Sequence, residues 1–573
     1  MSFFHLPDDI FIRCQSYLSL FDILSFGFSC KIFHNIVIHS LDEITIESIK
    51  DIKMILNYCG DNSLSIKNIY FTKKYVYRGH SHAKMFKMFK MVLIKCKKEF
   101  IEYIEFPPRM VDDSLLSYYR CLNNLKKIIL RGMVISNIDF LANLENLEYL
   151  SLEDDSFRKY GILDIKIIQN LKKLKYLDCS DNTSEYDRYV YSLELINNFS
   201  DLEYLNLTNV QPGEDDIDFL DLLKLNNLKN LRCIKLSNIV KNFEYIVILF
   251  PNLENITLTD CKSIVSFKHL KDLHNLKTLN LHGIVVEMMI MEDNDYDYNS
   301  IQYITQLETI HLSLNSTSNI VFMDRLTNLT DIDLATCNNI NNLEPLRNLT
   351  KLKYLNLEEC GSIQSIEPLK NLLNLQHLNI SNYELLYHLI DLQILEITTE
   401  HPSINLISLK KLRIKCQKIT FLEPLRYLVN IEYLDLTFCQ KIISLEPLRN
   451  LINMKYLNLL HGHEIISLEP LSNLVNIEKL YLYDYNKITS LEPLKNLIKL
   501  IILNLTECSQ IENLEPLQNL INLKKLILRR CFKILDYTPL CSLKTIDVIY
   551  TTRHESLDII SLLSQKLPNS YIY

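Results

Sequence analysis

The feature that most constrains this chain of 573 residues is a short string that recurs at a fixed interval. Leu-Glu-Pro-Leu begins at Leu343, Leu422, Leu445, Leu468, Leu491 and Leu514, and Ile-Glu-Pro-Leu begins at Ile366. Consecutive copies are 23 residues apart, except for one longer gap between Ile366 and Leu422. A period of this length indicates stacked structural repeats, so a long chain can form a repeat array instead of several globular domains.

Each repeat reads as one strand followed by one tight return. The apolar positions of a representative repeat are Leu349, Leu352, Leu355, Leu357, Cys360 and Ile363. Side chains alternate along a strand, so Leu355 and Leu357 are expected to point into the core while Tyr354 and Asn356 point outward. Proline fixes its own φ, and 23 residues leave room in the return for only one turn of 3₁₀ or α-helix. Because one such coil cannot bury its leucine face alone, the coils must stack.

This pattern resembles the leucine-rich repeat, and in particular the short repeats with a Pro-Leu return found in internalin-like proteins. The resemblance implies an α/β solenoid, a horseshoe or arc with parallel strands on the concave face. Counting the third consensus position of each repeat predicts nineteen strands, at Ile128, Leu150, Leu177, Leu205, Ile234, Ile256, Leu279, Ile310, Ile332, Leu355, Leu378, Leu395, Leu412, Leu434, Leu457, Leu480, Leu503, Leu526 and Ile546.

The spacing also predicts irregularities in the array. Inserted loops are expected at residues 154–160, 181–189, 212–221 and 285–300. Two shortened coils are expected between Leu378 and Leu412. Weaker motifs around Ile44, Ile69 and Ile104 predict three early strands.

Composition and charge exclude several functional classes. The chain carries 61 Lys and Arg against 69 Asp and Glu, a formal net charge of -8, whereas general nucleic-acid binders present a basic face. The chain has 9 glycines and neither a G-x-G-x-x-G nor a G-x-x-x-x-G-K string, which excludes the phosphate loops of most nucleotide-using enzymes. No apolar run reaches the length of about 18 residues that a membrane span needs. We therefore expect neither a nucleic-acid nor a membrane partner.

The cysteines follow the repeat. Six of the 15 share one phase, three residues after the second strand leucine: Cys261, Cys337, Cys360, Cys439, Cys508 and Cys531. This regularity predicts small buried core residues in the reduced state. The total is odd, no C-x-x-C occurs, and the N-terminal sequence lacks the layout of a signal peptide. We expect an intracellular protein, cytoplasmic or nuclear, that is not secreted.

Three other motifs are interpreted without special chemistry. His461–Glu464 (H-G-H-E) lacks the H-E-x-x-H spacing of a zinc-binding helix and is read as turn residues. Asp293–Asp297 lacks the glycine and the closing glutamate of a calcium loop. The basic and apolar run at residues 84–91 is read as the solvated face of a helix. Since no Ser/His/Asp or Cys/His set is found, the sequence predicts a protein that is not an enzyme and uses no cofactor or metal.

The segment 1–40 does not fit the repeat and predicts a small helical cluster. Its motifs are Leu6-Pro7-Asp8-Asp9-Ile10, Ser16-Tyr17-Leu18, Asp22-Ile23-Leu24 and Cys30-Lys31-Ile32-Phe33. Their order resembles an F-box. The resemblance implies docking to the adaptor subunit of an SCF-type, cullin-based ubiquitin ligase, through Leu6, Pro7, Ile10, Tyr17, Leu18 and Ile23. A generic helical cap over the first coil is the alternative.

The predicted organisation has four parts. These are an F-box-like head at 1–40, degenerate repeats or a linking segment at 41–120, the solenoid at 121–550, and a helical cap at 551–573. In the last part Leu557, Ile560, Leu563 and Leu567 recur at helical spacing.

What remains is the outward side of the strands, where tyrosines and polar residues recur at equivalent positions. The residues predicted to bind a protein client are Tyr354, Asn356, Tyr433, Asp435, Tyr456, Asn458, Lys479, Tyr481, Tyr483, Asn504, Lys525 and Arg529. Tyr149, Tyr176, Tyr204 and Asn206 occupy equivalent positions earlier in the chain. Rigid aromatic side chains with polar neighbours are enriched in protein interfaces. For any single tyrosine, a simple preference for strand positions is the alternative.

Two functions fit these observations. The first is the substrate receptor of an SCF-type ubiquitin ligase, in which the head docks the adaptor and, through it, the cullin, while the strands hold an unknown protein client. This reading depends on the F-box resemblance. The second is a protein-binding scaffold with no connection to ubiquitin ligation.

Overall fold

The structure is a computed structural model of the chain. It describes residues 43–46, 55, 67–71, 101–105, 122–130, 138–152, 162–180, 188–191, 193–212, 222–237, 242–261, 264, 267–282, 298–313, 319–380, 408–414, 420–437, 439–543, 546, 548–550, 563, 565–567 and 571–572. The predicted head, including Leu6 and Ile23, lies outside these residues, as do the segments 84–91 and 293–297. The chain forms two compact units, Met1–Leu276 and Lys277–Tyr573.

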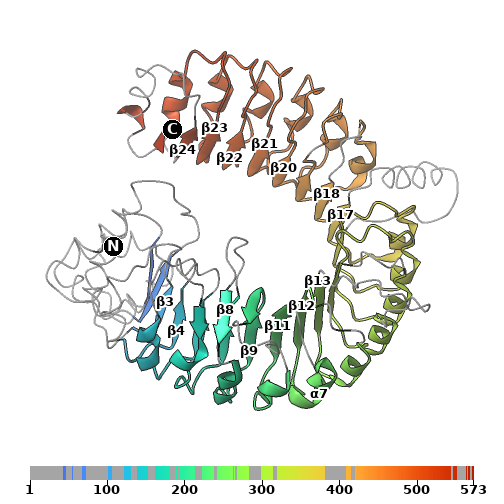
Figure 1. Ribbon diagram of the computed structural model, residues 1–573. Coiled ribbons are helices and arrows are strands. Elements are labelled where there is room, and N and C mark those ends of the chain that lie inside the picture. The colour runs from blue at the N-terminus through green and yellow to red at the C-terminus, as the bar shows by residue number, and fades with distance from the viewer. Residues whose placement is uncertain are drawn as a thin grey trace, which may run out of the picture. The chain divides into compact units, whose positions relative to one another are not determined.

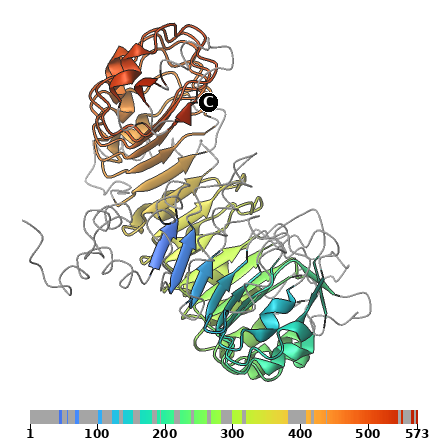
Figure 2. The ribbon, with the colours of Figure 1, turned by 90° about the vertical axis from the view of Figure 1, so that its left-hand side faces the viewer.

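Each unit is a leucine-rich-repeat solenoid whose coils each add one short strand to a parallel ladder (Figure 1). The ladder of the first unit consists of β1 (Glu43–Ile46), β2 (Asn68–Phe71), β3 (Tyr103–Glu105), β4 (Lys127–Ile129), β5 (Tyr149–Ser151), β7 (Tyr176–Asp178), β9 (Tyr204–Leu207), β11 (Cys233–Ser237) and β12 (Asn255–Thr259). In Figure 2 these strands form a row of arrows that all point the same way. The three early motifs lie in β1, β2 and β3, as predicted.

The second unit has the same construction. Its strands are β13 (Thr278–His282), β14 (Thr309–Leu312), β15 (Asp331–Asp333), β16 (Tyr354–Leu357), β17 (His377–Ile380), β18 (Lys411–Ile414), β19 (Tyr433–Asp435), β20 (Tyr456–Asn458), β21 (Lys479–Tyr481), β22 (Ile502–Asn504), β23 (Lys525–Ile527), β24 (Val548–Tyr550) and β25 (Tyr571–Ile572). Register is kept from rung to rung, since Leu355 faces Leu378 and Leu457 faces Leu480, which in turn faces Leu503. The predicted period is therefore the period of the ladder.

Two predicted strand positions are wrong. β17 and β18 pair directly, with Leu378 opposite Leu412, so no rung at Leu395 lies between them. Near the C-terminus the rung opposite Leu526 is Ile549 instead of Ile546. In both places the apolar spacing of the sequence fits a rung that the pairing of the strands does not contain, and sequence counting does not reveal this.

Two other elements of the structure had no counterpart in the sequence analysis. Strands β6 (Ile162–Asp164), β8 (Arg188–Tyr191) and β10 (Val210–Pro212) form a separate three-stranded parallel sheet with β8 in the middle. Insertions in three successive coils thus stack on one another as the coils do. At the C-terminus, β25 pairs with β24 as a further rung, after a helical stretch in which the Leu567 N–H donates to the Leu563 carbonyl at 2.8 Å.

Where the structure gives the bounds of a return opposite the strands, it is a short 3₁₀-helix, with one short α-helix, α7 (Ile246–Leu249), among them. In the first unit they are η4 (Asp139–Asn143), η5 (Ile165–Ile167), η6 (Leu193–Asn198), η7 (Leu222–Leu225), η8 (Phe243–Tyr245) and η9 (Lys268–Asp272). In the second they are η10 (Tyr298–Tyr303), η11 (Val321–Arg325), η12 (Glu344–Leu346), η13 (Glu367–Asn371), η14 (Glu423–Tyr427), η15 (Glu446–Leu448), η16 (Glu469–Leu471), η17 (Glu492–Leu494), η18 (Glu515–Leu517) and η19 (Thr538–Ser542).

The recurring Glu-Pro pair begins the turns η12 to η18, as its spacing predicted. Proline lies in the first turn, where a missing N–H leaves no hydrogen bond unmade. In all of these turns except η14, the glutamate N–H is capped by the side chain two residues earlier. In η12 the Asn342 Oδ1 accepts from the Glu344 N–H at 2.9 Å, and in η16 the Ser467 Oγ accepts from the Glu469 N–H at 3.1 Å. The position of these turns is therefore determined locally, by the proline and by the capping side chain that precedes it.

Between strands and returns, columns of leucine and isoleucine fill the core. Each rung contributes one fully buried side chain, such as Leu355, Leu457 and Leu503, each 0% exposed. Burial of a leucine stabilises a fold by roughly 1.5–3 kcal/mol, and the residue can be buried only if the next coil covers it. Stability is thus a property of neighbouring coils and not of one coil.

Two side-chain ladders tie neighbouring coils together. The six periodic cysteines are at most 2% exposed, and each thiol lies 3.0 to 3.9 Å from a carbonyl oxygen of the preceding coil. The six cysteines are therefore buried core residues, as predicted, and their thiols are not joined in disulfides. Asparagines before the strands form a second ladder, donating from Nδ2 to a carbonyl of the preceding coil at 2.8 to 3.0 Å: Asn146, Asn230, Asn252, Asn328, Asn374, Asn453, Asn476 and Asn522.

The cysteine column is interrupted at two coils by a compensating pair. Gly462 and Tyr485 stand where the flanking coils have Cys439 and Cys508. Tyr485 is 2% exposed, and a Cβ added to Gly462 would lie 2.7 Å from its Cε1 atom and closer still to Cζ and the hydroxyl. The ring of Tyr485 therefore fills the space that a side chain at position 462 would occupy.

We predict that Gly462→Cys lowers the melting temperature of the protein, because overpacking of a full core costs about 1–3 kcal/mol. Tyr485→Cys alone also lowers it by leaving a cavity, while the double variant recovers most of the loss by restoring the cysteine column. Thermal melting followed by circular dichroism measures both. Gly361→Ala is the matched control, since its Cβ would meet nothing nearer than the Asn338 Oδ1 at 4.0 Å. A double variant no more stable than the weaker single variant would contradict the pairing.

Candidate protein-binding face

The outward side chains of the strands form a surface in each unit, here called the strand face. Because the rungs are in register, residues at equivalent positions of successive strands stand about 4.8 Å apart in straight columns. The first outward position of each strand is often tyrosine, and the next outward position, two residues later, is often Asn or Asp. These two columns contain most of the residues predicted to bind a client.

In the first unit three tyrosines of the first column stack face to face. The ring centroids of Tyr149 and Tyr176 are 3.8 Å apart, and those of Tyr176 and Tyr204 are 3.9 Å apart, with interplanar angles of 8° and 7°. The Lys127 Nζ lies 4.0 Å from the centroid of Tyr149, and the Lys235 Nζ lies 5.5 Å from that of Tyr204. A cation thus stands at each end of this stack, where it meets the electron-rich face of a ring.

The second unit carries a similar cluster, with an arginine at one end. Tyr433 and Tyr456 stack with centroids 4.0 Å apart at 9°, and Tyr481 follows at 5.5 Å with a tilt of 44°. The Arg413 Nη2 lies 3.3 Å from the Tyr433 hydroxyl, and its Nε donates to the Asp435 carboxylate at 3.2 Å. The structure therefore brings three of the predicted client-binding tyrosines together and adds Arg413, which the sequence analysis did not single out.

Burial raises the pKa of several of these phenols, which strengthens their preference for the neutral form. Desolvation is the main cause that raises the pKa of Tyr176, Tyr354, Tyr456 and Tyr481 above the ordinary tyrosine value. All four therefore remain neutral at physiological pH and can donate a hydrogen bond to a ligand. Tyr354 contacts His377 of the next rung edge to face, with ring centroids 6.0 Å apart.

The second column acts mainly on the backbone. The Oδ1 atoms of Asn206, Asn356, Asp435 and Asn504 accept the N–H of the residue two positions later, at 3.0 to 3.1 Å. Asn356 and Asp435 are 8% and 5% exposed. These short side chains hold the chain as it leaves the strand, so they support the face more than they present chemistry to a partner.

Asn458 departs from that pattern. It is 8% exposed, and its Nδ2 donates to the Thr437 hydroxyl at 2.9 Å. Its Oδ1, by contrast, is a buried oxygen with no hydrogen-bond partner. An unsatisfied buried acceptor costs about 1–3 kcal/mol, so Asn458 is a locally destabilising residue of the second column.

Toward the C-terminal end the strand face becomes basic. Lys479 and Arg529 are exposed, and Lys525 is half-buried. Tyr483 donates toward Glu507, an interaction that is the main cause of its raised pKa, and the Arg530 Nη1 contacts the same carboxylate at 2.5 Å. The predicted residues of this part are thus exposed or partly exposed and lie on consecutive coils, β21 to β23.

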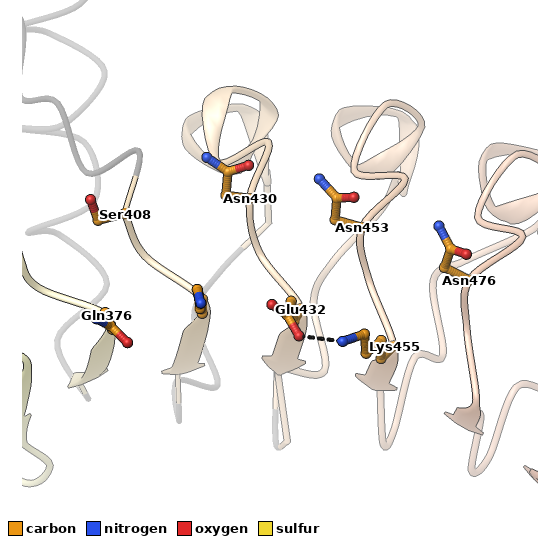
Figure 3. A pocket seen from close by; sticks show the side chains of 8 residues that line it. Gln376, Ser408, Asn430, Glu432, Asn453, Lys455 and Asn476 are labelled. Carbon is orange, nitrogen blue, oxygen red and sulfur yellow. Dashed lines mark hydrogen bonds and ion pairs between the residues drawn. The ribbon is translucent and has the colours of Figure 1, made fainter.

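A polar groove lies beside the strand face of each unit, at the edge where the strands begin. In the second unit its volume is about 600 Å³, and Figure 3 shows Asn430, Asn453 and Asn476 at one level above Glu432 and Lys455. The Lys455 Nζ contacts the Glu432 carboxylate at 2.7 Å. The equivalent groove of the first unit, about 520 Å³, is lined by Lys175, Asp201, Glu203, Asn230, Arg232, Asn252, Glu254 and Asn275. Charged and amide side chains dominate both, unlike the apolar pockets that take small molecules.

Comparisons with known proteins agree with the repeat architecture. A family model described as "Leucine Rich repeats (2 copies)" matches residues 475–519. No curated protein matches the sequence. Within the described residues, every helix is too short or too polar to cross a bilayer.

Several solved structures are similar to this chain at low identity. An internalin, InlF, of Listeria monocytogenes is 22% identical over 58% of this chain and 88% of its own, with a TM-score of 0.44. A leucine-rich-repeat protein of Leptospira interrogans is 19% identical over 80% and 97%, with a TM-score of 0.39. InlJ of Listeria monocytogenes, whose functional domain includes a cysteine ladder, is 18% identical over 72% and 70%, with a TM-score of 0.31.

We predict that Asp435→Ala loosens the turn after β19, because the Thr437 N–H and the Arg413 guanidinium then lose a common acceptor. Loss of a buried hydrogen bond of this kind costs about 1–3 kcal/mol. Asp435→Asn should cost less, since an amide oxygen can still accept the backbone N–H, as it does at Asn356 and Asn504. Hydrogen exchange of the peptide containing Thr437 measures this directly. Equal exchange in the wild type and the alanine variant would contradict the assigned role.

Proposed function

We propose that this protein is a binding scaffold whose strand face holds a protein client. The observation that carries the proposal is the pair of tyrosine clusters, Tyr149 with Tyr176 and Tyr204, and Tyr433 with Tyr456 and Tyr481. Stacked rings on a rigid ladder lose little conformational entropy on binding, which is why tyrosine is enriched among residues that dominate interface energy. No chemistry by the chain itself is required.

The charges around the clusters favour an acidic partner segment. Lys127 and Lys235 flank the first cluster, and Lys479 lies opposite Tyr456 of the second, where Arg413 is paired with Asp435. Such cations would guide the approach of a negatively charged segment and then be partly desolvated against the rings. The chain as a whole is acidic, with a net charge of -8, so this local basic character is a property of the face and not of the composition.

We further propose that the protein acts as the substrate receptor of an SCF-type ubiquitin ligase. The support is the F-box-like order of motifs in the segment 1–40, where Leu6, Pro7, Ile10, Tyr17, Leu18 and Ile23 would contact the adaptor. Its mechanism would be proximity, since a client held on the strand face is brought close to a ubiquitin-loaded enzyme supplied by the partners. A binding scaffold without this connection is the second candidate.

We predict that the SCF adaptor co-purifies with the full chain and that Leu6→Asp combined with Pro7→Ala reduces its recovery by an order of magnitude or more. A charge placed in an apolar contact costs several kcal/mol, which explains the size of the effect. Ile498→Asp, at an exposed apolar position of the solenoid far along the sequence, serves as the control. Equal recovery with all three proteins, or none with the wild type, would reject the ligase role and leave the scaffold role untouched.

We predict that Tyr433→Ser with Tyr456→Ser abolishes recovery of the client. Residues that dominate an interface contribute at least about 2 kcal/mol each, or roughly thirtyfold in affinity. Affinity purification of the tagged full chain, quantified by mass spectrometry, identifies proteins that the double variant loses. Tyr427→Ser is the matched control, because this tyrosine is 53% exposed and lies in the return η14 instead of a strand. A protein lost equally with both variants would not be a client of the strand face.

A further inference from the structure

Two histidines and an aspartate from neighbouring coils meet just beyond the C-terminal ends of β20 and β21. The Asp484 Oδ2 lies 3.4 Å from the His463 Nδ1 and 3.8 Å from the His461 Nδ1. One ligand atom from each of the three residues can be chosen so that all lie within 4.8 Å of one another. His461–Glu464 lack the spacing of a zinc-binding helix and are predicted from the sequence to be turn residues. Asp484 is distant in sequence and approaches them only through the stacking of coils.

We propose that His461, His463 and Asp484 form a binding site for a divalent transition-metal cation, with zinc as the best fit. Two imidazole nitrogens and one carboxylate oxygen are the donors that zinc accepts, and a three-residue set leaves a further position for water or another ligand. Magnesium and calcium are disfavoured, because they prefer sites built of oxygen alone. Nothing in this proposal depends on the client-binding role.

Two of the three ligand separations are close to those around a bound metal, and the third, between the two histidines, is at most 4.8 Å. With zinc bonds of about 2.0–2.1 Å in tetrahedral geometry, the ligand atoms lie roughly 3.3 Å apart. The separation of 3.4 Å between His463 and Asp484 already matches this value, and the 3.8 Å between His461 and Asp484 closes with a small side-chain rotation. Side-chain exposures of 27%, 42% and 16% for His461, His463 and Asp484 leave the site open to solvent on one side.

The backbone that carries the three ligands is fixed. His461 and Asp484 occupy the same left-handed position of successive coils, with φ of 69° and 66°. Their N–H groups donate to the next coil, at 2.9 Å to the Tyr483 carbonyl and 2.8 Å to the Thr506 carbonyl. Between the histidines, Gly462 lies against the buried ring of Tyr485. The ligands are thus placed by the ladder and do not have to be ordered by the metal.

A second layer orients the carboxylate. The Asp484 Oδ1 accepts from the Asn486 Nδ2 at 2.5 Å, and the Asn486 Oδ1 accepts from the Ser509 hydroxyl at 2.8 Å. This arrangement leaves Oδ2 directed toward the histidines, and outer contacts of this kind are typical around metal ligands. The next coils show the contrast, since Glu507 at the equivalent position is paired with Arg530. Within the described residues, the Asp484 carboxylate instead lies beside the Nδ1 atoms of the two histidines.

The test is titration of the full chain, freed of metal by a chelator, with zinc in a calorimeter. We expect one site of micromolar or better affinity that His463→Asn and Asp484→Asn each weaken at least tenfold, because even loss of an outer contact costs about 10- to 100-fold. Asparagine tolerates the left-handed backbone of residue 484, so the second variant should fold. His274→Asn, which removes an exposed histidine of the first unit, should bind as the wild type does.

Cobalt as a spectroscopic probe gives an independent readout. A visible absorption band of the cobalt-loaded wild type should vanish in both ligand variants and persist in His274→Asn. Zinc should also raise the melting temperature of the wild type and leave that of Asp484→Asn unchanged, since a ligand stabilises the state that binds it. Equal binding by the wild type and both ligand variants would show adventitious capture elsewhere, and the absence of stoichiometric binding at micromolar zinc would show a histidine–aspartate ion pair alone. Either result overturns the proposal.

Discussion

The structure depends on one constraint: the strands of neighbouring coils must pair in register, so that the leucines of one coil pack directly against those of the next. Leu457 is buried because Leu434 and Leu480 flank it on the neighbouring rungs. Hydrogen bonds between the parallel strands fix this register. The cysteine and asparagine ladders add further hydrogen bonds to the preceding coil on either side of each strand. A rung out of register would expose an apolar side chain and leave backbone groups unpaired at once. This is why the array tolerates varied outward residues but keeps its core positions so regular.

The same constraint produces the candidate binding face. The distance between neighbouring strands sets the spacing of the outward side chains. Tyrosines at the same position in consecutive coils are therefore brought to stacking distance whether or not a partner is present. Tyr149, Tyr176 and Tyr204 come from coils that carry insertions, and their rings still lie 3.8 and 3.9 Å from one another. A column of aromatic rings is therefore a direct consequence of repetition, and what distinguishes one protein from another is which cations and amides stand beside it.

Sequence reasoning was most successful where a residue's environment is set by the repeat itself. The strand positions, the 3₁₀ returns at Glu-Pro and the burial of the periodic cysteines follow from period and alternation. It failed where apolar residues mimic the period, as at Leu395 and Ile546, because spacing alone carries no information about pairing. It also missed contacts between coils: Arg413 reaches Tyr433, and Tyr485 fills the space above Gly462. A signal was available, since these partners are separated by about one repeat, but only the structure shows which neighbours touch.

The pairing of Gly462 with Tyr485 has a consequence for how such an array can change in length. Coils that carry cysteine at this position are interchangeable, so recombination can add or remove any one of them without disturbing the packing of the others. Excising the single coil around Tyr485 would leave a glycine beside a cysteine and an empty space, and copying the coil around Gly462 would set two glycines side by side. The two coils therefore form one packing unit, and loss of either coil alone would leave the other without the neighbour that it fits.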